Sequence, residues 1–188
     1  MNIDTYIEKR WSPRAFDNKK IDSSVLEKIF IAGGRAASSF NEQPWRYIIG
    51  QKGSESYEKL FECLIEWNQS WAKTAPVLAL GVIKNTFSNN GKINHHASHD
   101  LGAASTNLSM KALEQDVFIH QMAGILPEKA KEIFKIPDGY QAVTVLAMGY
   151  IGDKNQLAED LAKQENGPSQ RKSLEEIVFS NNWEEAAF

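Results

Sequence analysis

Apolar and polar residues follow one another in blocks that predict both helices and strands. Apolar residues recur every three or four positions in residues 25–37 and 96–114, as on the buried face of an amphipathic helix. Residues 45–50 are rich in aromatic and β-branched side chains, which favours a strand. Residues 76–83 and 141–150 are nearly continuous apolar runs, which are typical of strands buried on both faces. The pattern therefore predicts a protein that combines helices with a buried sheet.

Shorter elements are predicted in most of the remaining chain. The spacing predicts helices over residues 3–9 and 53–65, and a strand over residues 117–121. Pro127 is suited to the first turn of a further helix. Residues 154–169 are charged and polar, and we expect either a short helix with a loop or a mobile lid there.

Small residues occur at two places inside the predicted helices. Gly33 and Gly34 each cost about 1 kcal/mol relative to Ala in a helix interior, so their presence indicates close packing against another element. Residues 102–105 are Gly, Ala, Ala and Ser. Such a small surface predicts a helix–helix contact, either within the chain or between subunits.

Composition narrows the class of protein. A chain of 188 residues with 42% hydrophobic residues is compatible with one domain over residues 1–188 and a single core. The net charge of −3 argues against a general nucleic-acid binder. A lone cysteine, Cys63, cannot form an intramolecular disulfide. Because there is no apolar signal core and no run long enough to span a bilayer, we expect a cytoplasmic protein without a membrane partner.

A polar turn between a predicted helix and a predicted strand is the first candidate site. Residues 36–45 contain two hydroxyls and two side-chain amides, which can present donors and acceptors to a flat polar ring. Pro44 pushes the preceding residue away from helical geometry. The alternative is a helix end and loop whose side chains satisfy local backbone groups, and composition alone favours it. The four side chains are Ser38, Ser39, Asn41 and Gln43.

A second candidate lies near the N-terminus, in the sequence RWSPRAF. Arg10, Ser12 and Arg14 alternate, so in an extended chain they share one face and can converge on one anion, such as a phosphate. The alternative is a pair of solvated arginines in ion pairs, and the triplet alone favours it.

Two further features point to chemistry only weakly. His95 and His99 have the spacing of a helical metal pair but lack the Glu of a metalloprotease motif, so structural or solvated histidines are favoured over a metal site. The turn around Gly124, just before a helix start, offers backbone N–H groups to an electron-rich atom. An ordinary turn that uses the dihedral freedom of glycine is the alternative.

The order of these motifs resembles the FMN-dependent nitroreductase family. The resemblance covers most of residues 6–179 and is carried by seven short motifs in the same order. They are RWSPR, SSFNEQPW, NQSWAKTAPVLAL, HDLGAASTNLSMKA, HQMAGILPE, the GY at residues 149–150, and RKSLEEIV.

The resemblance implies a three-layer α+β fold with a mixed central sheet. It also implies an intertwined homodimer with two FMN molecules at the subunit interface, where the small-residue helix would lie. The implied activity is hydride transfer from NADH or NADPH through flavin N5 to a small organic acceptor, by a ping-pong mechanism. The acceptors of the family include nitroaromatics, quinones and enones.

The resemblance also assigns FMN contacts to particular residues. The N-terminal motif would bind the phosphate, the ribityl chain and the ring edge; the polar turn would lie against the ring of the partner subunit's flavin; and the C-terminal basic pair would close on the phosphate. No side chain is expected to act as a nucleophile. The implied cofactor-binding residues are Arg10, Trp11, Ser12, Arg14, Ser38, Ser39, Asn41, Gln43, Asn68, Ala123, Gly124, Arg171 and Lys172.

Two positions depart from the family pattern, and two other functions stay open. Ala123 stands where many relatives carry Glu, and Asp116 stands where relatives often have Gly. A flavin-binding protein without turnover, for storage or sensing, would share every cofactor contact. A regulatory module that binds a nucleotide or phosphate ligand is the third reading.

Overall fold

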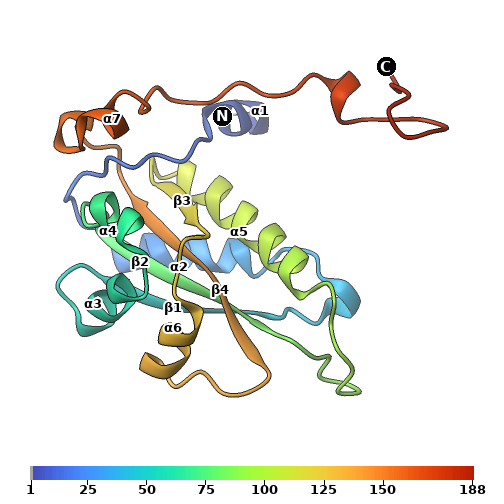
Figure 1. Ribbon diagram of the computed structural model, residues 1–188, viewed down its shortest axis with the longest axis horizontal. Helices are drawn as coiled ribbons and strands as arrows, with labels where there is room; N and C mark the ends of the chain where they lie inside the picture. The colour runs from blue at the N-terminus through green and yellow to red at the C-terminus, as the bar shows by residue number, and fades with distance from the viewer. Residues whose placement is uncertain (1) are drawn as a thin grey trace.

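The computed structural model describes residues 2–188 and has one sheet between two groups of helices (Figure 1). The two helices and three strands predicted from the apolar patterns of residues 25–37, 96–114, 45–50, 76–83 and 141–150 are all confirmed in type. The strands are β1 (Trp45–Gln51), β2 (Val77–Lys84), β3 (Phe118–Met122) and β4 (Tyr140–Gly149).

The helices also follow the predicted pattern, with shifted ends. The first long helix ends at Gly33, four residues before the predicted end. The α-helices are α1 (Ile3–Lys9), α2 (Ser23–Gly33), α3 (Glu55–Glu62), α4 (Glu66–Ala72), α5 (Ala97–Leu113), α6 (Pro127–Ile133) and α7 (Glu159–Ala162). Short 3₁₀ turns, η1 to η3, lie at Ser39–Asn41, Lys154–Gln156 and Leu174–Glu176.

The strand order is β1-β2-β4-β3, and all three pairings are antiparallel. The resemblance implied a mixed sheet, but no parallel pair of named strands occurs within residues 2–188. β1 and β3 are the two edges, so a parallel neighbour would need a further strand beside one of them.

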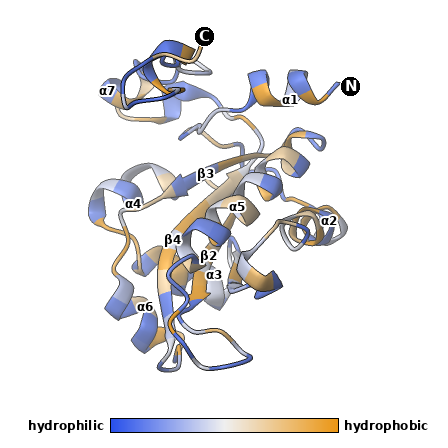
Figure 2. Cartoon of the chain, turned by 90° about the vertical axis from the view of Figure 1, so that its right-hand side faces the viewer, coloured by the Kyte–Doolittle hydropathy of each residue, from blue (hydrophilic) through white to orange (hydrophobic). Residues whose placement is uncertain are grey.

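The three-layer arrangement is confirmed by how the central strand β2 divides its side chains. Val77 and Ala79 point into a cluster with α2 and α5, whereas Leu78 and Leu80 point into a cluster with α3 and α4. Every β2 residue except the last is buried. The hydropathy colouring in Figure 2 accordingly shows apolar strands in the middle and alternating colours on the helices around them.

Close packing of α2 on α5 explains one of the two glycines. A Cβ atom at Gly33 would lie 2.7 Å from Cδ2 of Leu108, which is fully buried. Gly34 is exposed and has no such neighbour, since its nearest contact would be at 3.4 Å. The close packing predicted from Gly33 is therefore found within the chain, between α2 and α5.

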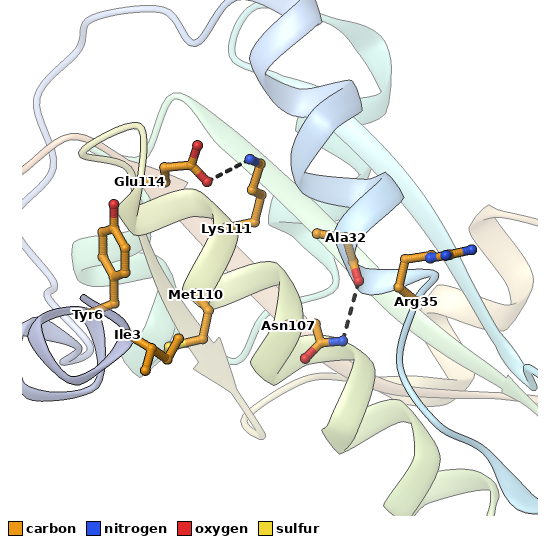
Figure 3. A pocket seen from close by; sticks show the side chains of 8 residues that line it. All are labelled: Ile3, Tyr6, Ala32, Arg35, Asn107, Met110, Lys111 and Glu114. Atoms are coloured by element: carbon orange, nitrogen blue, oxygen red, sulfur yellow. Dashed lines mark hydrogen bonds and ion pairs between the residues drawn. The ribbon is translucent and has the colours of Figure 1, made fainter. Parts of the chain in front are cut away.

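A groove of about 370 Å³ lies between α1, α2 and α5 (Figure 3). Asn107 of α5 donates a hydrogen bond to the backbone oxygen of Ala32 in α2 at 3.4 Å, and Lys111 pairs with Glu114 at 2.6 Å. None of the predicted cofactor-binding residues lines this groove.

The C-terminal part of the chain runs across the top of the molecule as drawn in Figure 1. Residues 154–169 form η2, α7 and a loop. The last stretch extends beyond the sheet and exposes Leu174, Ile177, Trp183 and Phe188. Among the helices described here, none has the length and apolar character needed to cross a membrane.

Asp116 precedes β3 and has a φ of 54°, a left-handed conformation that favours glycine. Its carboxylate accepts a hydrogen bond from the Lys9 ammonium at 2.6 Å. The position at which relatives often carry glycine is therefore one where this chain adopts a glycine-like backbone.

Candidate functional site

A polar cavity of about 350 Å³ lies between the N-terminal segment and the chain that follows α7. His120 of β3 contributes a side chain between these two walls. One wall is formed by Arg10, Trp11, Ser12 and Arg14, and the other by Gln164, Glu165, Gly167, Ser169 and Arg171. Three arginines and one glutamate make the cavity positive by two charges, although the whole chain is negative.

Arg10 and Arg171 face this cavity from opposite walls. Burial, and then the neighbouring Arg171 guanidinium, lower the pKa of Arg10. An Nη1 of Arg10 also donates to the Ser12 hydroxyl at 3.4 Å. The two guanidiniums repel each other, and an anion bound between them would offset that repulsion. This pair and the hydroxyl therefore form a donor set suited to a phosphate group.

Arg14 is held differently, by a buried carboxylate and an aromatic ring. Its guanidinium carbon lies 5.4 Å from the centre of the Trp67 ring, and its Nη1 lies 3.9 Å from Oε2 of Glu165. Nε of Arg14 and Oε2 of Glu165 are buried without a hydrogen-bond partner among the described residues. Arg14 is thus partly neutralised, and its Nε is free for a further acceptor.

His120 closes the inner side of the cavity. Its Nδ1 lies 2.9 Å from the backbone oxygen of Pro13, and its ring centre lies 4.5 Å from that of Trp71. Burial, as the largest cause, lowers the pKa of His120. Because the Pro13 carbonyl oxygen can only accept, Nδ1 of His120 carries a hydrogen and donates a hydrogen bond to it.

The turn after β3 lies against α4. Nδ2 of the buried Asn68 donates to the backbone oxygen of Gly124 at 2.8 Å, and the Ile65 N–H donates to the same oxygen at 3.2 Å. A Cβ atom at Gly124 would lie 2.6 Å from Asn68 Nδ2. Glycine is therefore needed here because α4 approaches closely, and not for a positive φ.

The backbone N–H of Gly124 forms no hydrogen bond with another described residue. Trp67, whose ring contacts the Arg14 guanidinium, precedes Asn68 in α4. The same helix, α4, thus contacts both Arg14 of the cavity and the Gly124 turn.

The polar turn between α2 and β1 is not part of the arginine cavity. The Ser39 N–H donates to Oδ2 of the buried Asp100 at 3.0 Å, and the Gln43 N–H donates to the Ser38 hydroxyl at 3.0 Å. Ser38 and Ser39 line a separate cavity of about 290 Å³ beside the start of α5. In Figure 1 this region lies at the opposite end of the molecule from α7.

Three residues of this turn adopt left-handed backbone conformations. Their φ values are 52° at Phe40, 57° at Asn41 and 50° at Gln43. Such conformations cost free energy in residues other than glycine and cluster at binding sites. Gln43 does avoid the right-handed helical region, as expected before proline.

The structure thus sorts the predicted site residues into groups. The arginine cavity brings together Arg10, Trp11, Ser12, Arg14 and Arg171. The turn after β3 brings Asn68 together with Gly124 and the exposed Ala123. The predicted site residues between positions 38 and 43 lie away from both. Lys172 is exposed and does not line the arginine cavity.

Five lining residues were missed by the sequence argument. The polar stretch 154–169 was the available signal, since we expected a lid there, but nothing marked Glu165 among its several charged residues. The missed residues are His120, Gln164, Glu165, Gly167 and Ser169.

His95 and His99 do not belong to a larger group of metal-ligating side chains among the described residues. Within residues 2–188, no group of three or more His, Cys, Asp or Glu side chains is placed to hold a metal ion. His99 instead lies beside Asp100, with 3.4 Å between Nδ1 and Oδ1.

Fold and site define a three-layer α+β protein with a positively charged cavity lined by three arginines. Comparison with solved structures identifies an oxidoreductase containing FMN that is 36% identical, with a TM-score of 0.91, over 97% of this chain and 93% of that one. The family model "Nitroreductase family" matches residues 7–73. The chain belongs to the nitroreductase family.

Two other relatives extend the comparison. An uncharacterized 15.4 kDa protein from the ask 5′ region of Mycolicibacterium smegmatis is 28% identical over 145 residues, which are 73% of this chain and 97% of that protein. A mutant of the FMN and NADPH-dependent nitroreductase NfnB from Sphigopyxis sp. strain HMH is 16% identical. Its TM-score is 0.75, over 97% of this chain and 100% of that one, which shows a shared fold.

Proposed function

We propose that this protein is an FMN-dependent oxidoreductase that uses NADH or NADPH to reduce a small organic acceptor. The observation that carries the proposal is the cavity in which Arg10 and Arg171 face each other from two segments. The 36% identical relative is an oxidoreductase containing FMN, and its likeness covers nearly the whole chain.

The donor set fits a phosphate monoester. Two guanidiniums and a hydroxyl offer several charge-assisted hydrogen bonds to one dianion, and a phosphate between the arginines offsets their repulsion. Arg10, Ser12 and Arg171 would hold the phosphate of FMN. The ring centres of Trp11 and Phe118 lie 6.4 Å apart, so Trp11 supports this wall.

The turn at Gly124 and the cation at Arg14 would serve the remainder of the cofactor. The free Gly124 N–H can donate to an acceptor on the ring, and Asn68 fixes the orientation of that turn. Ala123 has no side-chain group for the contact that Glu makes in relatives, so only its backbone can take part. Arg14 brings a positive charge that Glu165 partly offsets.

Bound FMN supplies the chemistry of hydride transfer at its N5 atom. The chain needs no nucleophile for this reaction. The nicotinamide and the acceptor would occupy one pocket in turn, which gives ping-pong kinetics. The acceptor class we propose is nitroaromatic, quinone or enone.

We further propose a homodimer in which the polar turn completes the site of the partner subunit. Within one chain, Ser38, Ser39, Asn41 and Gln43 lie far from the arginine cavity, so they can reach a cofactor only across an interface. The strained turn and the exposed small residue Gly102 at the start of α5 support this arrangement. A cytoplasmic location stays a prediction.

Flavin binding tests the proposal directly. Protein stripped of flavin should take up FMN with one site per chain, and should bind riboflavin, which lacks the phosphate, far more weakly. A colourless preparation that takes up no FMN would contradict the proposal and would favour a module for another phosphate ligand.

A further inference from the structure

Glu165 links the two walls of the arginine cavity. Its side chain is only 3% exposed, and its Oε1 accepts hydrogen bonds from the backbone N–H groups of Arg14 and Ala15, the latter at 3.0 Å. In the described chain, no other residue of 164–171 forms a hydrogen bond with residues 2–153. The Glu165 carboxylate is thus the polar anchor of this segment.

An anchor is needed because the cavity opposes its own closure. The positive charge of Arg171 lowers the pKa of Arg10, because the two guanidiniums repel each other. The two walls therefore repel each other before an anion binds. Arg171 itself is exposed, and its guanidinium donates only to the nearby backbone oxygens of Ser169 and Gln170, at 2.8 and 3.1 Å. Local contacts alone do not hold it opposite Arg10.

Several polar contacts compensate the burial of the Glu165 carboxylate. A buried carboxylate is costly unless it is paired and hydrogen-bonded. Here two backbone N–H groups and the Arg14 guanidinium surround Glu165. These contacts direct the negative charge toward the wall, which leaves Arg10 and Arg171 free for a ligand.

We propose that Glu165 is a positioning residue that holds residues 164–171 against the N-terminal segment, so that Arg171 faces Arg10 across the phosphate site. The inference rests on the proposed FMN function and adds a residue to that site. Glu165 would act through Arg171 and would not touch the cofactor.

Affinities for FMN and riboflavin separate this role from a general effect on folding. In Glu165→Ala, both backbone N–H groups lose their acceptor and Arg171 is released. FMN affinity should then fall about ten-fold to a hundred-fold, the value of a hydrogen bond to a charged group. Riboflavin does not use Arg171 and depends on Glu165 only through the contact of Glu165 with Arg14. Its affinity should therefore fall much less than that for FMN.

Three further variants sharpen the test. Glu165→Gln keeps an oxygen for the two N–H groups and should retain most of the preference for FMN. Arg171→Ala should lose as much FMN affinity as Glu165→Ala, and the double variant should lose little more, since both changes remove one contact. Glu159→Gln is the matched control, because Glu159 lies in α7 and pairs at the surface with Lys163.

Each outcome bears on one claim. If Glu165→Ala keeps the wild-type preference for FMN over riboflavin, or loses both ligands equally, the positioning role is wrong. If the wild-type protein itself does not prefer FMN, the proposed phosphate site fails, and the inference fails with it. Fluorescence titration of flavin-free protein measures all of these affinities.

Discussion

Arg10 combines partial burial, a like-charged neighbour and a nearby hydroxyl, and this combination is the basis of the proposed phosphate site. The sequence motif RWSPRAF, taken alone, favoured two solvated arginines in ion pairs. The structure shows why it was ambiguous: Arg14 does face a carboxylate, but one that stands 151 residues later in the chain.

Replacing Arg10 by Ala should therefore weaken FMN binding about ten-fold to a hundred-fold, because a charge-assisted contact worth about 1.5–3 kcal/mol is lost. Titration of flavin-free protein with FMN measures the change. Lys28→Ala is a suitable control, since it removes the same charge from an exposed position on α2. Equal FMN affinity in Arg10→Ala and wild type would show that the phosphate lies elsewhere.

His120 gives the fold a pH dependence. Its pKa is lowered in the folded protein, so below the usual value of about 6.5 the unfolded chain binds a proton that the folded chain does not. The free energy of unfolding should consequently fall as the pH drops through this value. Urea unfolding at several pH values should show a smaller fall in His120→Gln than in wild type.

His95→Gln is the control for this titration, because His95 is exposed on the loop before α5. It should keep the wild-type pH dependence. Parallel stability curves for wild type and His120→Gln would mean that burial of His120 does not contribute to acid sensitivity.

At the scale of elements, hydrophobic periodicity predicted the type of every strand and long helix, since core burial sets the pattern. The ends of helices were harder to predict from the pattern. α2 ends at Gly33, where the chain turns toward the polar loop. The pairing of strands also lay outside the pattern. Local sequence does not encode which strands become neighbours, and the antiparallel sheet of the chain differs from the mixed sheet implied by the resemblance.

The contact of α2 with α5 makes opposite predictions for two adjacent glycines. Gly33→Ala gains helix propensity of about 1 kcal/mol, but its Cβ would overlap the buried Leu108 side chain, and overpacking typically costs about 1–3 kcal/mol. We expect a net loss of stability. At Gly34, φ is a helical −64° and an added Cβ would meet nothing closer than the Ile31 backbone oxygen at 3.4 Å, so Gly34→Ala should be neutral or stabilising.

Chemical denaturation of both variants measures this difference. A Gly33→Ala protein as stable as Gly34→Ala would show that α2 and α5 can separate without cost, and would contradict the packing described here.

For the whole molecule, one chain holds the two parts of the proposed site at opposite ends, and it carries an extended C-terminal stretch with exposed Leu174, Ile177, Trp183 and Phe188. The order of motifs in the sequence pointed to both the arginine motif and the polar turn, through the family resemblance. It did not predict that they lie far apart in one chain, since spacing along the chain says nothing about distance in the fold. An assembly of two chains accounts for both features.

The native mass in solution should accordingly be twice the 21.1 kDa of the chain. A variant that ends after Lys172 keeps the arginine cavity but lacks the four exposed apolar side chains, and it should shift toward the monomer. Light scattering during gel filtration measures both masses. A wild-type monomer that binds FMN fully would contradict the shared site.

The central claim is that the cavity holds a flavin that accepts hydride from a nicotinamide. The most direct measurement is to mix the FMN-loaded protein anaerobically with NADH and, separately, with NADPH, and to record the visible absorbance of the flavin. We expect rapid bleaching with at least one of them, and recovery of the colour when a quinone or nitroaromatic is added. A flavin that stays oxidised with both nicotinamides would contradict the enzyme and favour a storage or sensor protein.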